Sequence, residues 1–154
     1  MLKIEDEFKF APESVREFAP GDVIFREGED SREMYIVVSG EVAVSKHFTG
    51  GDVVLARMKK GEFVGEMSLL ESLPRSATAR AEGPTRLLAI HPGGFLLKIR
   101  RDPTFAFEML QTLSRRIRIT NENLMRELNH QTSTPDSIRK VLHLAEYNKE
   151  DKSA

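Results

Sequence analysis

Apolar and polar residues alternate in short runs between Pro20 and Ile90, and glycine or charged turns separate the runs. A period of two is typical of strands that bury one face. The pattern predicts strands at residues 23–25, 34–38, 42–45, 53–58, 77–81 and 85–90. About eight antiparallel strands are expected in all, which suits a jelly roll or a short barrel closed against its own edges. The spacing alone does not choose between these two.

The period of the apolar positions changes after His91 and Pro92. Phe95 and Ile99 fit a short helix that the Arg-Asp-Pro sequence at 101–103 interrupts, because proline is accepted in a first turn but not inside a helix. A long helix is predicted over about 103–130. Its apolar residues recur at steps of three, four or seven, the spacing of a coiled-coil stripe, and are Leu110, Leu113, Ile117, Leu124 and Leu128.

Residues 131–154 are predicted to form a hinge, a short amphipathic helix and a disordered tail. The Gln-Thr-Ser-Thr-Pro-Asp segment at 131–136 offers helix N-caps. The apolar face of the helix comprises Ile138, Val141, Leu142 and Ala145. We therefore expect one folded domain over residues 1–130, including the long helix, followed by this appendage.

Composition narrows the class of protein. The 154 residues suit a single core, and the formal net charge of -1 gives no overall attraction to nucleic acid. The absence of cysteine fits a reducing compartment, and no signal peptide or run of about 20 apolar residues is present, so a cytoplasmic location is expected. The four histidines are scattered, and no nucleophile elbow or phosphate-loop lysine motif occurs, so neither a metal site nor an enzyme is expected.

The most informative stretch is residues 61–81, which we call the cassette. Gly61 and Gly65 let the backbone approach a ligand, and a helical turn can open at Glu66 with free N–H groups facing an anion. Arg75 and Ser76 follow a proline, so a guanidinium fork and a hydroxyl can meet the same phosphate. The Glu66 carboxylate suits a ribose hydroxyl. Together these groups predict that the ligand is a small nucleotide whose single phosphate is a cyclised diester.

The cassette resembles that of the cyclic nucleotide-binding domain family, and roughly residues 20–130 resemble the sensor of bacterial catabolite activator (Crp/Fnr-type) proteins. The resemblance implies a mainly β fold, an eight-stranded antiparallel jelly roll or β-roll with flanking short helices and a long C-terminal helix. It implies that Thr120 meets the base in its own chain and that Asn121 approaches the base held by a partner chain. The expected ligand-binding residues are Gly65, Glu66, Met67, Ser68, Arg75, Ser76, Ala77, Thr120 and Asn121.

Each of these residues also has a plainer interpretation. Arg75 could be a structural arginine paired with a glutamate, and Glu66 could only complement a helix dipole. Thr120 and Asn121 could fix the register of a dimer seam. The arginines at 115, 116 and 118 are interpreted as a solvated helix face rather than a nucleic-acid site, because acidic residues share the helix.

The sequence as a whole predicts a non-enzymatic sensor of a 3′,5′-cyclic purine nucleotide, with cAMP favoured over cGMP. We expect a homodimer through the long helix and a signal passed to a protein partner. No DNA binding is expected, because no recognition helix follows, and no membrane binding, because no long apolar run is present. Three alternatives stay open: a truncated or remnant Crp-type transcription regulator, a ligand-free dimerisation module of the same fold, and a receptor for cyclic dinucleotides.

Overall fold

The computed structural model describes residues 14–131 of the chain. It divides into two compact units, Met1–Met109 and Leu110–Ala154, and the division falls within the last described helix. The first unit contains all the strands found among residues 14–131, and each unit is described by itself. The predicted hinge, amphipathic helix and tail after residue 131 lie outside the described residues.

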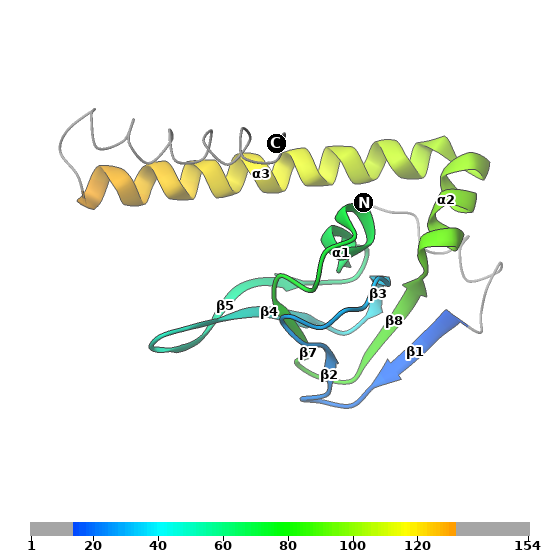
Figure 1. The fold of residues 1–154 in the computed structure, drawn as a ribbon, viewed down its shortest axis with the longest axis horizontal. Helices are drawn as coiled ribbons and strands as arrows, with labels where there is room; N and C mark the ends of the chain where they lie inside the picture. The colour runs from blue at the N-terminus through cyan, green and yellow to red at the C-terminus, as the bar shows by residue number, and fades with distance from the viewer. Residues whose placement is uncertain (1–13, 132–154) are drawn as a thin grey trace, which may run out of the picture. The chain divides into compact units, whose positions relative to one another are not determined.

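One sheet has the strand order β1-β8-β3-β6. Figure 1 shows β1 and β8 side by side. The strands of this sheet are β1 (Val15–Phe18), β8 (Thr85–Ile90), β3 (Met34–Ser39) and β6 (Phe63–Val64). All three pairings are antiparallel, and β3 pairs with β8 from Met34 opposite Ile90 to Ser39 opposite Arg86. The central strand β3 is buried on both faces over five of its residues, which explains its nearly continuous apolar sequence.

The second sheet has the order β2-β7-β4-β5. Its strands are β2 (Val23–Phe25), β7 (Thr78–Ala81), β4 (Val42–Phe48) and β5 (Gly51–Met58), again antiparallel throughout. The structure thus confirms the prediction of eight antiparallel strands. Six of them coincide with the predicted runs; β1 and β6 were not predicted, because four and two residues are too few to show a period.

The two sheets share one apolar core. Its members come from both sheets and are all less than a tenth exposed: Phe25, Tyr35, Val37, Val42, Met58, Val64, Ala79, Leu87 and Ala89. Alanine at two of these positions leaves room for the large rings of Phe25 and Tyr35, which stack with centroids 6.2 Å apart. The stacked rings lie directly beneath the cassette, as described below.

Three helices complete the described part of the chain: α1 (Glu66–Glu71), α2 (Pro92–Arg101) and α3 (Pro103–Gln131). Pro92 and Pro103 each occupy a first helical turn, where the missing N–H costs nothing. The rings of Phe95 and Phe105 meet edge to face at 6.1 Å and fix the bend between α2 and α3. The predicted short and long helices are both present.

Candidate functional site

The cassette folds as β6, a tight turn, α1 and a loop that leads into β7. Gly65 precedes α1 in the left-handed region at φ 85°, and Ser72 follows it at φ 58° with its N–H bonded to the Ser68 oxygen at 3.1 Å. Two left-handed residues therefore restrict α1 to six residues. Its first-turn N–H groups lie next to Gly65, in the same cassette as Arg75.

Neighbouring main-chain groups fix Arg75 at the end of the loop. Its N–H donates to the Glu29 oxygen at 2.9 Å, and its oxygen accepts from the Gly28 N–H at 2.8 Å. Gly28 has φ 79°, so the turn that supplies both contacts needs a residue free to adopt the left-handed region. The backbone of Arg75 is thereby held to a turn more than 40 residues earlier in the chain.

The guanidinium of Arg75 is buried against neutral acceptors. Nε donates to Ser31 Oγ at 2.9 Å, Nη1 to the Gly65 main-chain oxygen at 3.0 Å, and Nη2 to the Glu33 main-chain oxygen at 2.7 Å. The cation also stacks on the Phe25 ring, 4.0 Å from its centroid. Only 3% of Arg75 is exposed, although arginine is rarely buried without a partner of opposite charge.

No ion pair among residues 14–131 includes Arg75. Burial lowers the pKa of Arg75, and the more distant anionic groups Glu29, Glu33 and Glu66 partly oppose that effect. The guanidinium stays charged, because arginine does not deprotonate in proteins. The plainer interpretation of Arg75, a glutamate salt bridge, therefore finds no support in the described residues, and a buried positive charge is available to an anion.

Gly65 is required at its position for a steric reason as well as a conformational one. A Cβ atom there would lie 2.7 Å from Arg75 Nη1, 3.0 Å from the Glu33 oxygen and 3.2 Å from the Phe25 ring. Real Cβ atoms essentially never show the first distance, and the other two are tighter than most real Cβ contacts. In the structure Gly65 packs closely against the arginine and its acceptors, and the approach of its backbone to a ligand stays a prediction.

The other cassette residues surround this centre. Glu66 and Ser68 are buried, at 8% and 2% exposed, and Ala77 is buried in the loop that enters β7. Met67 is half exposed, and the Ser76 hydroxyl donates to its sulfur at 3.6 Å. The main-chain oxygen of Ser76 accepts from Lys46 Nζ at 2.9 Å, which adds a second cation beside the loop. The structure brings together all seven predicted residues from 65 to 77.

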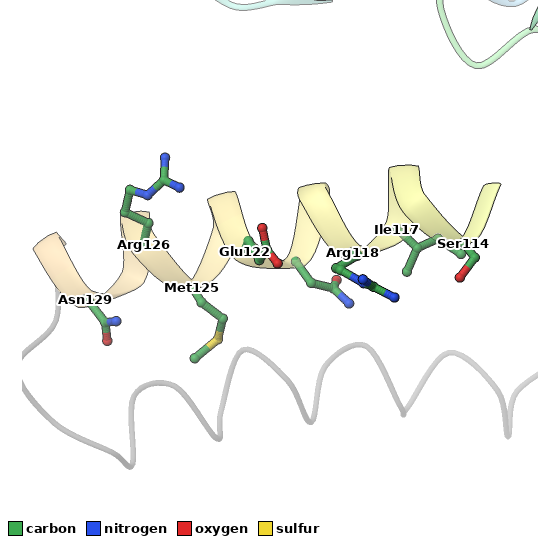
Figure 2. Close-up of a pocket in the computed structure, with 8 residues that line it drawn as sticks. Ser114, Ile117, Arg118, Glu122, Met125, Arg126 and Asn129 are labelled. Atoms are coloured by element: carbon green, nitrogen blue, oxygen red, sulfur yellow. The ribbon is translucent and has the colours of Figure 1, made fainter. Parts of the chain in front are cut away.

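Thr120 and Asn121 belong to the second unit. Both are exposed on α3. Asn121 is one of eight side chains that line a pocket along one face of the helix (Figure 2), with Ser114, Ile117, Arg118, Glu122, Met125, Arg126 and Asn129. Thr120 does not line this pocket. The predicted roles of the two residues at the base remain predictions.

Three contacts of the guanidinium were not predicted from the sequence: Ser31, the main chain of Glu33, and the Phe25 ring. Each is separated from Arg75 by more than 40 positions, and the Glu33 contact uses a main-chain oxygen, whose role the side chain does not reveal. Only the apolar alternation that makes Phe25 a core residue gave a signal in the sequence.

Two further findings concern the described residues only. No cluster of histidine, cysteine and acidic side chains there could hold a metal ion. Within residues 14–131, neither α3 nor a shorter helix combines the length and apolar character needed to cross a membrane.

Comparison with known proteins agrees with this architecture. The model of the cyclic nucleotide-binding domain matches residues 15–102. The cyclic AMP receptor protein of Thermus thermophilus is 39% identical over 104 residues, which cover 67% of this chain and 48% of that protein. The chain therefore spans about half the length of this relative.

Solved structures show the same similarity. The catabolite activator protein of Thermus thermophilus superposes with a TM-score of 0.68 at 36% identity, over 77% of this chain and 57% of that chain. A structure from work on a cyclic-GMP-dependent signalling pathway that regulates bacterial phytopathogenesis gives 0.63 at 30% identity, over 79% of this chain and 95% of that chain. On the family match, the sequence identity and the shared two-sheet fold, this chain belongs to the cyclic nucleotide-binding domain family.

Proposed function

We propose that this chain is a non-enzymatic sensor of a 3′,5′-cyclic purine nucleotide, with Arg75 as the ligand of the cyclic phosphate. The observation that carries the proposal is the buried guanidinium, which has neutral acceptors and no ion pair among residues 14–131. Of the five N–H donors of an arginine, three are used by these acceptors. The remaining two can form charge-assisted bonds to a phosphodiester.

The rest of the cassette supplies the other contacts in this proposal. The Ser76 hydroxyl, exposed beside Arg75, exchanges its weak bond to Met67 sulfur for a phosphate oxygen. The buried Glu66 carboxylate binds the ribose 2′-hydroxyl, and its charge lies close enough to Arg75 to influence the pKa of the guanidinium. Gly65, Met67, Ser68 and Ala77 contribute shape and main-chain N–H groups. A monoanionic phosphate and one sugar hydroxyl are what these groups can satisfy.

Cyclic AMP is favoured over cyclic GMP because the Thermus thermophilus relative, at 39% identity, is named as a cyclic AMP receptor. Because the chain is also similar to a structure from work on a cyclic-GMP-dependent pathway, cyclic GMP is tested as the second ligand. Ser76 does not decide between them, since a hydroxyl beside the phosphate can also reach a guanine edge. The base is therefore to be settled by measurement.

The output of the sensor in this proposal is a rearrangement of α3. Apolar side chains along the distal part of α3 are largely exposed, among them Leu110 at 64% and Ile117 at 61%. Exposed apolar residues at helical spacing favour a homodimer seam. Thr120 then meets the base in its own chain and Asn121 the base held by the partner chain, so that binding shifts a population of helix arrangements read by a protein partner.

Calorimetric titration with cyclic AMP, cyclic GMP and the acyclic control 5′-AMP tests the proposal, together with a light-scattering mass with and without ligand. We expect micromolar or tighter binding of one cyclic nucleotide, much weaker binding of 5′-AMP, and a dimeric mass. A folded dimer that binds neither cyclic nucleotide would instead favour a ligand-free dimerisation module. The exposed apolar face of α3 is the observation that keeps this second candidate.

A further inference from the structure

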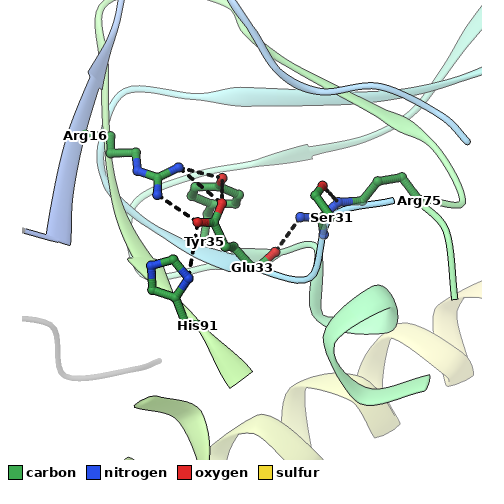
Figure 3. Close-up of polar contacts among 6 residues, drawn as sticks. All are labelled: Arg16, Ser31, Glu33, Tyr35, Arg75 and His91. Carbon is green, nitrogen blue, oxygen red and sulfur yellow. Dashed lines mark hydrogen bonds and ion pairs between the residues drawn. The ribbon is translucent and has the colours of Figure 1, made fainter. Parts of the chain in front are cut away.

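Glu33 contacts two groups of residues (Figure 3). Its main chain contacts the guanidinium of Arg75, which we call the anion site. Its side chain contacts a separate polar cluster. Glu33 immediately precedes β3, and its side chain is 21% exposed. Its main-chain oxygen accepts from Arg75 Nη2 at 2.7 Å, the shortest of the three hydrogen bonds that the guanidinium makes. One residue therefore belongs to two networks, and the second has no role in the function proposed above.

Three side chains hold the Glu33 carboxylate. Arg16 of β1 donates from Nη2 to Oε1 at 2.7 Å and from Nη1 to Oε2 at 3.1 Å. The Tyr35 hydroxyl donates to Oε2 at 2.6 Å, and His91 Nδ1 lies 3.2 Å from Oε1. The hydrogen bond from Arg16 keeps the pKa of Glu33 below its ordinary value, although burial opposes this. The carboxylate is thus ionised and fixed in orientation.

A series of stacked side chains connects the two networks by a second path. The Arg75 cation lies over Phe25, Phe25 stacks on Tyr35, and the Arg16 guanidinium lies 5.8 Å from the Tyr35 centroid. Tyr35 then returns to Glu33 through its hydroxyl. Because this path closes on itself, the position of the Arg75 guanidinium is coupled to the Glu33 cluster through both a main-chain bond and packed rings.

His91 connects the cluster to the start of α2. It is the residue before Pro92, and its main-chain oxygen accepts the Phe95 N–H at 2.8 Å. Its side chain makes no capping hydrogen bond to the helix but contacts Glu33, the residue before β3. The Glu33 carboxylate therefore contacts the point at which β8 ends and α2 begins.

A ligand that pulls the Arg75 guanidinium outward, beyond using its two remaining donors, would disturb this arrangement. Only 3% of Arg75 is exposed, and three of its donors are engaged. A phosphate that draws the guanidinium outward would lengthen its hydrogen bond to the Glu33 main-chain oxygen, the shortest of the three. Any displacement at that oxygen moves the residue whose carboxylate is anchored to Arg16, Tyr35 and His91.

We propose that Glu33 is a positioning residue of the anion site, which orients Arg75 through its main chain and links the state of Arg75 to the start of α2 through its carboxylate and His91. The proposal rests on the function proposed above. Glu33 does not touch the nucleotide; it fixes where the guanidinium lies before binding and passes its displacement to α2 afterwards.

Four variants of the full chain separate these roles. Glu33→Gln keeps the shape and removes the charge that Arg16 and His91 contact. His91→Ala removes only the link to α2. Glu17→Gln is the matched control, because it breaks an arginine–carboxylate pair with Arg86 between β1 and β8, away from the cluster. Arg16→Gln removes the charged partner of the Glu33 carboxylate and replaces Glu33→Gln in the experiment if that variant does not fold.

Three readouts are measured for each variant: cyclic AMP affinity, the phosphorus NMR resonance of the bound nucleotide, and ligand-induced hydrogen exchange at residues 91–97. We expect Glu33→Gln to weaken binding about threefold to tenfold, to shift the phosphorus resonance and to abolish the exchange response. His91→Ala should lose only the exchange response, and Glu17→Gln should resemble wild type. A merely destabilised site would leave the bound resonance unchanged.

Failure of this proposal differs from failure of the function. A folded Glu33→Gln protein with wild-type affinity, resonance and exchange response would overturn it. If wild type binds no cyclic nucleotide, the function fails, and the ligand-free nitrogen NMR signal of the Arg75 Nε–Hε group decides the positioning role. That signal should move in Glu33→Gln and not in Glu17→Gln; an unmoved signal in both would overturn the role of Glu33.

Discussion

Apolar and charged residues occur together both in the cassette, residues 61–81, and in the distal part of α3, residues 110–131. The two regions differ in how far these residues are buried and in where their contacts come from. Arg75 and Ser68 are 3% and 2% exposed, and the contacts of Arg75 with Gly28, Glu29 and Ser31 come from a distant part of the chain. Leu110 and Ile117 are 64% and 61% exposed on one long helix. The geometry of the cassette is therefore complete within the first unit, whereas the apolar face of α3 gains a role only when another surface covers it.

Among the variants that test this difference, Arg75→Ala is expected to have the largest effect, which is on cyclic nucleotide affinity. The change removes a charged fork and should weaken cyclic nucleotide binding roughly 100-fold, or about 3 kcal/mol. Arg75→Lys should recover little, because a point charge cannot reproduce the fork. Calorimetric titration measures both. Arg32→Ala, which removes a nearby half-buried arginine paired only with exposed Asp30, should bind like wild type.

If Arg75→Ala binds as wild type while remaining folded, the cassette does not hold the phosphate through this residue. Folding has to be checked separately, because the substitution leaves the buried oxygens of Gly65 and Glu33 without their donor. Such orphaned acceptors cost about 1 to 3 kcal/mol each when they stay dry.

Gly65→Ala tests whether the cassette is held by close packing. Its φ of 85° alone costs an alanine about 1 kcal/mol, and the new Cβ would meet Arg75 Nη1 at 2.7 Å. We expect the free energy of unfolding to fall by about 2 to 3 kcal/mol, as measured by denaturant titration. Gly21→Ala is the matched control, since Gly21 has φ 86° but nothing within 4 Å of a Cβ atom.

The difference between the two glycine variants isolates the steric part from the conformational part. Gly21→Ala should lose only about 1 kcal/mol. Equal losses for both would mean that the contact between residue 65 and Arg75 is looser in solution than in the structure.

The sequence predicted the local features of this molecule far better than the distant ones. Six strands, the short helix after Gly65 and the two later helices follow from periodicity and proline positions. The seven cassette residues from 65 to 77 lie together because they are close in sequence. By contrast, Ser31, Glu33 and Phe25 reach Arg75 across more than 40 positions, and the Glu33 contact uses a main-chain oxygen that every residue has. No local pattern encodes such a contact.

A third prediction concerns α3. Ile117→Asp places a charge on the exposed apolar face without disturbing the core of the first unit. If this face is a homodimer seam, burial of the side chain contributes about 1.5 to 3 kcal/mol to dimerisation. The dissociation constant of the dimer should therefore rise roughly 10-fold to 100-fold in Ile117→Asp. Sedimentation across a range of concentrations measures it. Asn123→Asp, an exposed position with no apolar side chain to lose, is the matched control.

An unchanged mass in Ile117→Asp would separate α3 from dimerisation and leave its apolar face for the protein partner. Nucleotide affinity measured on the same variant adds a second distinction. Retained binding by a monomer would show that the cassette works within one chain, whereas loss of binding would support the contact that Asn121 is proposed to make with the nucleotide of a partner chain.

The smallest effect is expected from the acid dependence of the Glu33 cluster. The pKa of Glu33 is lowered by Arg16, so the ionised carboxylate contributes stability above its unfolded pKa of about 4.3, and this contribution is lost as the pH falls through the lower folded value. Because Arg16 is 44% exposed, the contribution should stay below about 1 kcal/mol. Denaturant titration from neutral pH to about pH 3 measures it, over the range in which carboxylates protonate. Glu33→Gln should flatten the curve, while Glu17→Gln should keep the wild-type slope; equal slopes in wild type and Glu33→Gln would mean that Arg16 does not hold the carboxylate in solution.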